Sequence, residues 1–238
     1  LGGGAVLTYT PFKDGEDEAD GEVMKFLTYN VMHMQGDTEE EGYPLRRYIQ
    51  ESDADVVCLQ EYLWDEHKTK KVFPMYPYRR LLKASNGNGM ACLSRFPILS
   101  VKQISYVSGN NASFLLKLKM KEDTLSLVCN HLESNKLDAH YKEVYEGLLK
   151  SPNEQKVKSD SKYLLRKLAD AVAIRGPQAD SVAQVISRQS GKYLLVCGDF
   201  NDSPISYAHH TIGKGLTDAY REAGWGPGFS YNRNFLYF

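Results

Sequence analysis

Several polar residues of this sequence stand at the ends of apolar runs that predict β-strands. Asn30, Glu61 and His131 each end such a run, and Asp199 and Asn201 follow the last one. Carboxylates bind hard cations such as Mg²⁺, amides orient water or substrate oxygens, and a histidine can donate a proton to a leaving group. Because strand ends can meet at one rim of a sheet, these residue types predict a site that hydrolyses a phosphate ester.

The apolar runs that would position these residues predict mainly β structure. Alternating or nearly continuous apolar residues, bounded by turn residues, are typical of strands. The predicted strands cover residues 23–30, 56–61, 90–94, 98–106, 113–120 and 124–131, and a last one starts at Tyr193.

Helical spacing is confined to two regions of the sequence. One short helix is predicted over 44–52, with Pro44 in its first turn. Apolar residues at steps of three and four within 136–189 predict amphipathic helices interrupted at Gly176–Pro177, and the polar stretch 151–160 predicts a loop. Many strands covered by a few helices favour an α/β sandwich in one domain.

Bulk composition predicts a folded globular protein. The chain has 238 residues, of which 42% are hydrophobic and 25% charged, and its formal net charge is -1. This charge argues against a protein that coats duplex DNA, which usually carries a basic face. The net charge does not exclude a local basic cleft.

The four cysteines predict buried thiols. Cys58, Cys92, Cys129 and Cys197 each lie inside an apolar run, and no pair has the C-x-x-C spacing of a zinc site. We favour the interpretation that these cysteines act as small hydrophobic side chains in buried strands, rather than forming disulfides.

The first 22 residues differ from the rest. Residues 13–22 are acidic and almost without apolar side chains, so we interpret 1–22 as a linker or N-terminal extension, ahead of a weaker metal-binding alternative, and 23–238 as the domain. The sequence does not begin with Met, so an upstream leader or apolar anchor would make this an exported or membrane-tethered domain. No run approaches the roughly 18 apolar residues of a membrane span.

Four motifs together resemble the endonuclease/exonuclease/phosphatase superfamily. They are Thr28-Tyr-Asn-Val, Leu59-Gln-Glu, Asn130-His-Leu-Glu-Ser and Gly198-Asp-Phe-Asn-Asp-Ser-Pro, in the family's order and spacing. The resemblance spans about Val23 to Tyr231, and the last motif is the most specific. It implies the α/β, DNase I-like fold, in which two packed, mainly antiparallel β-sheets are flanked by helices.

The resemblance also implies roles for the strand-end residues. Glu61 resembles the principal metal ligand, and Asn30 the amide that supports metal or phosphate. His131 resembles the histidine that binds the phosphoryl group or protonates the leaving oxygen, Asp199 the group that orients or activates water, and Asn201 the amide that contacts phosphate. The implied cofactor is Mg²⁺ or Mn²⁺, and the implied step is direct in-line attack of water without a covalent intermediate.

Each of these residues also has a structural interpretation. Asn30 and Asp199 could simply form turns, Glu61 could be a solvated carboxylate, and His131 alone would more often be structural. Further expectations concern residues near the motifs. We expect packing or rim support from Arg175 and Gln178, turn positions for Glu133, Ser134 and Asp202, exposure for His209–His210, and a solvated loop for the basic residues at 68–71 and 79–80.

Two departures from the family pattern bear on function. Met32 stands where some abasic-site endonucleases carry Asp, which weakens that assignment. Ser230-Tyr231 fits the family's late Ser/Thr-Tyr element, with Tyr231 as a substrate contact, but the chain ends at Phe238 before a closing Ser-Asp-His. We therefore expect the chain as given to lack the C-terminal end of the domain and to be impaired, and its parent protein to be active.

The favoured function is a divalent-metal-dependent hydrolase of a phosphate ester, most simply a phosphodiesterase. The alternative is an inactive binding module of the same fold that recognises a phosphorylated partner. The substrate class stays open between nucleic acid, phospholipid and small molecule. We expect a monomer with no obligate protein partner.

Overall fold

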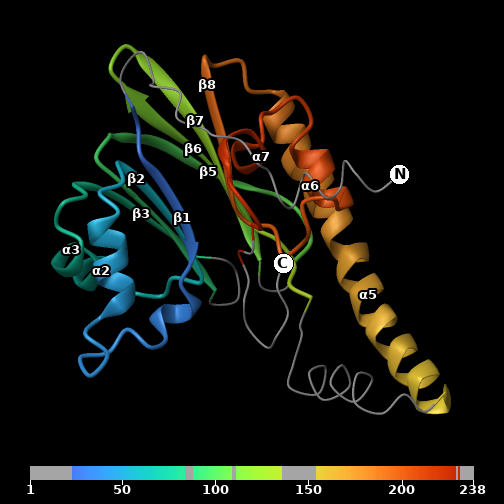
Figure 1. Ribbon diagram of the computed structural model, residues 1–238. Helices are drawn as coiled ribbons and strands as arrows, with labels where there is room; N and C mark the ends of the chain where they lie inside the picture. The colour runs from blue at the N-terminus through green and yellow to red at the C-terminus, as the bar shows by residue number, and fades with distance from the viewer. Residues whose placement is uncertain (1–22, 84–87, 109–110, 136–153, 229, 231–238) are drawn as a thin grey trace. The chain divides into compact units, whose positions relative to one another are not determined.

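A computed structural model describes residues 23–83, 88–108, 111–135, 154–228 and 230 (Figure 1). Within these residues, eight strands form two four-stranded sheets, ordered β1-β2-β4-β3 and β5-β6-β7-β8. The strands of the first sheet are β1 (Phe26–Asn30), β2 (Val56–Gln60), β3 (Tyr78–Lys83) and β4 (Gly89–Ser94). Those of the second sheet are β5 (Ile98–Ile104), β6 (Ala112–Met120), β7 (Asp123–His131) and β8 (Tyr193–Asp199).

Both sheets are mainly antiparallel, with one parallel pair in each. β1 pairs with β2 in parallel, and β7 pairs with β8 in parallel, while the other neighbouring strands are antiparallel. The register sets Asn30 opposite Gln60 and His131 opposite Asp199. Parallel pairing therefore brings the carboxyl ends of two strands together in each sheet.

The two sheets pack face to face on an apolar core. Small and branched side chains from both sheets fill it, and they are nearly all inaccessible to water. The core residues include Val56, Cys58, Cys92, Phe114, Leu116, Leu118, Leu127, Cys129 and Cys197. All four cysteines are buried free thiols, so that prediction is confirmed.

Two helices cover the outer face of the first sheet. Helix α2 (Pro44–Glu51) buries Ile49 there, and α3 (Glu66–Val72) leads into the buried Phe73 (Figure 1). The helix predicted over 44–52 is confirmed. The solvated loop expected at 68–71 is wrong because Asp65 caps α3 by accepting a hydrogen bond from the Lys68 amide.

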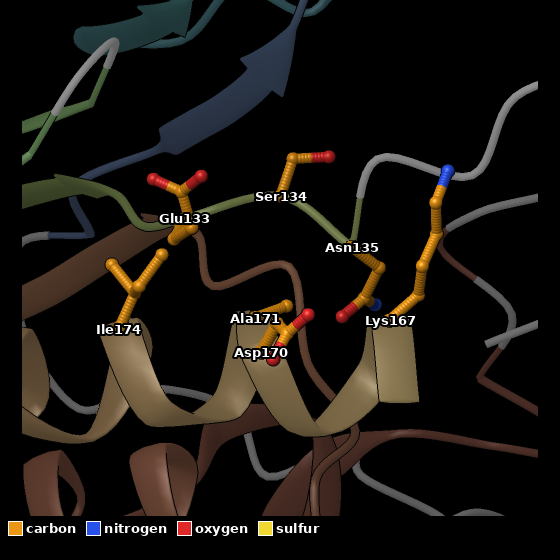
Figure 2. A pocket seen from close by; sticks show the side chains of 7 residues that line it. All are labelled: Glu133, Ser134, Asn135, Lys167, Asp170, Ala171 and Ile174. Carbon is orange, nitrogen blue, oxygen red and sulfur yellow. The ribbon is translucent and has the colours of Figure 1, made fainter. Parts of the chain in front are cut away.

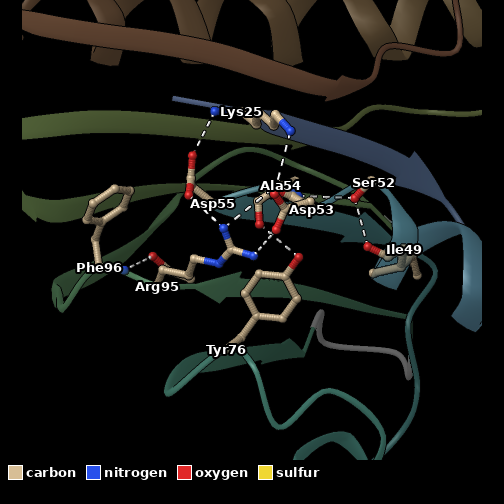
Figure 3. A network of polar contacts seen from close by, with 10 residues as sticks. Lys25, Ile49, Ser52, Asp53, Ala54, Asp55, Tyr76, Arg95 and Phe96 are labelled. Atoms are coloured by element: carbon tan, nitrogen blue, oxygen red, sulfur yellow. Dashed lines mark hydrogen bonds and ion pairs between the residues drawn. The ribbon is translucent and has the colours of Figure 1, made fainter. Parts of the chain in front are cut away.

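Arg79 and Arg80, also expected in a loop, lie in β3. Side chains link this strand to α3, since Arg79 pairs with Glu66. At the same end of the first sheet, Arg95 follows β4 and binds both Asp53 and Asp55, just before β2 (Figure 3). The hydrogen bond from Arg95 lowers the pKa of the exposed Asp53 carboxyl.

The remaining helices are η1 (Met32–Met34), α5 (Glu154–Ser187), α6 (Tyr207–Ile212) and α7 (Ala219–Ala223). Helix α5 runs through Pro177, so the predicted interruption at Gly176–Pro177 is wrong. The loop predicted at 151–160 is also wrong over its described part, because residues 154–160 belong to α5. Pro177 offers no amide hydrogen to the preceding turn. On either side of it, Arg175 donates to the Glu133 carbonyl and Gln178 accepts from the Glu133 amide, and these buried hydrogen bonds hold the helix in place.

The described residues form two compact units. One unit contains both sheets and consists of the described residues within 23–132 and 184–200. The other consists of the described residues within 133–135, 154–183 and 201–230. The assignment of 23–238 to one domain stays a prediction, and the linker predicted at 1–22 lies outside the described residues. No helix among those described is long and apolar enough to cross a membrane.

Candidate active site

One amide joins two carboxylates from opposite sheets. Asn30, at the end of β1, donates from Nδ2 to Glu61 Oε1 at 3.0 Å and to Asp199 Oδ2 at 2.9 Å. Glu61 directly follows β2, and Asp199 ends β8. The structure therefore brings together three of the residues that the sequence singled out, all within the two-sheet unit.

Two histidines flank the Glu61 carboxylate. His131 Nε2 lies 3.7 Å from Oε1, and His33 Nε2 lies 3.8 Å from Oε2. His131 is almost fully buried, whereas the side chains of Glu61 and His33 are 24% and 39% exposed. The carboxylate is thus open to solvent on the His33 side, where a ligand could reach it.

The backbone around this carboxylate is strained. Glu61 has a φ of 52°, and Met32, His33 and Met34 have φ values of 42°, 59° and 61°. Non-glycine residues rarely adopt this left-handed region, and each such residue costs about 1–3 kcal/mol. Two hydrogen bonds hold the turn, from the Met32 amide to Asn30 Oδ1 and from the His33 amide to the Glu61 carbonyl.

His33 and Asn88 are residues that the sequence reasoning missed. His33 Nε2 lies 3.2 Å from Asn88 Oδ1 as well as near Glu61. Its approach depends on three consecutive left-handed residues, and methionine and histidine carry no strong preference that would announce such a turn. No spacing signal could have identified it.

Gly198 sets the position of Asp199. Its φ is 129°, and a Cβ built there would lie 2.0 Å from the Asn130 carbonyl oxygen. The close approach lets β8 lie against β7, with the Leu132 amide donating to the Asp199 carbonyl at 2.9 Å. Asp199 is thereby fixed at the level of His131.

Asn201 and Tyr231 are the other two predicted site residues. Asn201 belongs to the second unit, has a φ of 51°, and accepts a hydrogen bond on its carbonyl from Asn135 Nδ2 at 3.2 Å. Tyr231 lies outside the described residues.

The second unit is organised around the buried Arg175. Its guanidinium donates to the Glu133 carbonyl at 2.7 Å, to Asn135 Oδ1 at 2.9 Å and to Asp202 Oδ2 at 2.9 Å. Gln178 Oε1 accepts from the Glu133 amide. The packing role expected of Arg175 and Gln178 is confirmed. Glu133 is not a turn residue but a buried one in an irregular segment.

A pocket of about 210 Å³ lies beside this network and takes in none of the predicted site residues (Figure 2). It is lined by Glu133, Ser134, Asn135, Lys167, Asp170, Ala171 and Ile174.

The two-sheet site offers hard oxygen donors to a divalent cation. Glu61 and Asp199 both lie within hydrogen-bonding distance of the same Asn30 nitrogen, so their negative charges are concentrated in one place. In the described part of the chain they do not form a closed cage of three ligand atoms within 4.8 Å. Mg²⁺ typically binds one or two carboxylates and completes its shell with water and substrate phosphate, so the residues fit such an ion.

Comparison with known proteins adds a family and a fold. A sequence model of the Endonuclease/Exonuclease/phosphatase family matches residues 27–237. Among solved structures, the human Nocturnin catalytic domain with bound sulfate is 16% identical with a TM-score of 0.57, over 88% of this chain and 78% of that one. D. rerio TDP2 complexed with single strand DNA product is 16% identical with a TM-score of 0.53, over 82% and 66%.

Sphingomyelinase C from Streptomyces griseocarneus is 18% identical with a TM-score of 0.53, over 82% of this chain and 70% of that one. These likenesses confirm the DNase I-like fold predicted from the motifs. This chain spans 66% of the D. rerio TDP2 chain and 63% of the truncated Caenorhabditis elegans TDP2 chain. No curated protein matches it by sequence.

Proposed function

We propose that this chain, which belongs to the endonuclease/exonuclease/phosphatase family, hydrolyses a phosphodiester with a divalent metal and a directly attacking water. Members of the family are metal-dependent phosphoesterases that act on phosphoester substrates. The observation that carries the proposal is the Asn30 amide, hydrogen-bonded to Glu61 and Asp199 from opposite sheets. That contact aligns two carboxylates beside His131.

Each side chain has a task that its position supports. Glu61, oriented by Asn30, would hold the Mg²⁺ or Mn²⁺ ion, and Asp199 would accept the proton of the attacking water. His131, 3.7 Å from Glu61, would donate a proton to the leaving oxygen. A divalent ion bound here would neutralise negative charge on the phosphoryl group.

Preorganisation is the physical basis of the proposed rate enhancement. The Asn30 bonds and the turn at Glu61 fix both carboxylates before substrate arrives, so little reorganisation is needed at the transition state. Asn201 and Tyr231 remain proposed substrate contacts.

The first test is hydrolysis of bis(p-nitrophenyl) phosphate with Mg²⁺ or Mn²⁺. We compare the full-length gene product, this chain, and the variants Glu61→Gln and Asp199→Asn. Removing a group that stabilises transition-state charge typically lowers kcat about 10²–10³-fold, and we expect losses of this order with the fold retained. Chelation of the metal with EDTA should abolish turnover by the unmodified protein.

Glu66→Gln is the matched control, because this carboxylate on α3 lies outside the motifs, is 61% exposed and pairs with Arg79. Full activity in Glu61→Gln would refute the assignment of Glu61. No turnover by the full-length protein on this compound, on single-stranded DNA or on sphingomyelin vesicles would favour the binding-module alternative.

Metal binding has its own readout. A ligand that binds only the folded state raises stability by about 2.7 kcal/mol at 100 times its Kd. Mg²⁺ or Mn²⁺ should therefore raise the thermal unfolding midpoint of the wild-type and Glu66→Gln proteins. The same ions should leave the thermal unfolding midpoint of the Glu61→Gln protein unchanged.

A further inference from the structure

Three cysteine sulfurs meet in the core between the two sheets. Cys58 of β2, Cys129 of β7 and Cys197 of β8 place their Sγ atoms within 4.8 Å of one another. Cys92 of β4 is the register partner of Cys58, and Cys129 is the register partner of Cys197. In the part of the chain that the structure describes, no other three potential metal ligands are gathered this closely.

One pair within this cluster is closer than ordinary packing allows. The sulfurs of Cys58 and Cys129 lie 2.7 Å apart, whereas those of Cys129 and Cys197 lie 3.7 Å apart. Nonbonded heavy atoms pack best at about 3.5–4.0 Å, and a disulfide bond is about 2.05 Å long. Cys58 and Cys129 therefore sit between contact and bond, on strands that belong to opposite sheets.

The backbones are also close at this point. Cα atoms of β2 come within 8 Å of Cα atoms of both β7 and β8. Cysteine is small, so a cluster of cysteines lets two sheets approach more closely than leucine or phenylalanine would. Immunoglobulin sandwiches place a disulfide between their sheets in a comparable setting.

We propose that Cys58 and Cys129 form a disulfide joining the two sheets when the protein meets a mild oxidant, either hydrogen peroxide or glutathione disulfide. The two thiols lose two protons and two electrons as the S–S bond forms. With peroxide the oxidant is reduced to two water molecules, and with glutathione disulfide it becomes two glutathione thiols. Cys197 and Cys92 keep their thiols.

A shared metal ion fits the cluster less well. Zinc–sulfur bonds of about 2.3 Å in a tetrahedral site hold sulfurs roughly 3.7 Å apart, which is wider than the Cys58–Cys129 contact. Burial raises the pKa of both Cys58 and Cys129. The thiolates that oxidation requires therefore form more readily while the chain is unfolded. A disulfide is neutral, so it suits a core of Val56, Phe114 and Leu127.

The cross-link would lie directly under the candidate active site. Cys58 lies on β2, three residues before Glu61, which directly follows that strand. Cys129 lies two residues before His131 on the same face of β7. The bond would fix the relative position of the strands that carry these two residues. The inference stands whether or not the proposed phosphodiesterase activity is found.

The test maps disulfides in the wild-type protein. The full chain is refolded from denaturant in a glutathione redox buffer, so that every thiol is accessible, and folded protein is treated separately with peroxide. We expect an intact mass lower by two hydrogens, a single linked peptide pair that contains Cys58 and Cys129, and a higher thermal midpoint than that of the reduced protein.

Three substitutions sharpen the result. Cys58→Ala and Cys129→Ala should abolish this linked peptide, while Cys92→Ala, the matched control in the same core, should retain it. Four free thiols after refolding in the oxidising buffer would overturn the proposal. So would a different pair, or a metal ion retained in the native mass. Mapping of the wild-type protein decides the matter even if a variant does not fold.

Discussion

At the residue scale, buried polar groups of this protein are held by a few specific hydrogen bonds. Tyr62 illustrates this, since its ring packs beside Trp64 and its hydroxyl lies 2.8 Å from Oγ1 of Thr69 on α3. Burial raises the pKa of Tyr62 to about 12. The neutral phenol is therefore the form that the folded protein favours.

This shift predicts a pH-dependent stability. Because the folded pKa exceeds the ordinary value of 10.0, the contribution of Tyr62 is fully present below about pH 10 and is lost as pH rises through about 12. Tyr62→Phe should cost about 1 kcal/mol at pH 7 through the lost hydrogen bond. The difference in the free energy of unfolding between Tyr62→Phe and wild type should narrow between pH 10 and 12.

Urea unfolding at pH 7, 10 and 11 measures this gap. Tyr78→Phe is the control, because that ring is 40% exposed. A constant gap between Tyr62→Phe and wild type across this range would show that Tyr62 does not titrate in the way its burial predicts.

At the element scale, the β7–β8 pair depends on a glycine. Gly198→Ala would place a methyl group 2.0 Å from the Asn130 carbonyl and force alanine into a φ of 129°. We expect a loss of at least ~3 kcal/mol in the free energy of unfolding, or failure to fold. Gly191→Ala should change it by less than about 1 kcal/mol, because its nearest neighbour would lie at 3.6 Å.

Chemical denaturation of both variants provides the comparison. Similar stabilities for the two would mean that β8 can shift away from β7 at little cost, and that Asp199 is less firmly placed than the register indicates.

Sequence patterns predicted those strands that are specified by the apolar residues of their own segment. β2 and β8 are nearly continuous apolar runs, β7 is apolar from Leu125 to Cys129 except at Ser126, and the motif residues lie where these runs stop. Helix α3 has no apolar periodicity and forms because Asp65 caps it and Thr69 is buried against Tyr62. The position of His33 was likewise beyond prediction, because tertiary contacts impose its left-handed turn.

At the scale of the whole molecule, single side chains connect segments that are distant in sequence. Arg175 binds residues 133, 135 and 202, and only 2% of its side chain is exposed. Its partner Asp202 is 16% exposed, so the ion pair is well shielded from solvent. Loss of one partner from such a pair leaves an uncompensated charge.

Arg175→Met should therefore lower the free energy of unfolding by about 3–5 kcal/mol. Arg188→Met, at an exposed position just after α5, should be nearly neutral. Thermal and urea unfolding of the two variants test this difference, and the addition of Asp202→Asn to Arg175→Met should recover part of the loss. A mild effect of Arg175→Met alone would contradict the structural role given to the network.

The parallel pairing of β7 with β8 also has a kinetic consequence. Residues 132–192 separate the two strands, whereas β5, β6 and β7 follow one another through short connections. Closing the longer loop is entropically slower, so β8 should join the sheet last as the chain folds. Pulsed hydrogen exchange should show β8 amides becoming protected after those of β6 and β7. Because β8 delivers Asp199, a newly synthesised chain would gain its candidate catalytic centre only at the end of folding.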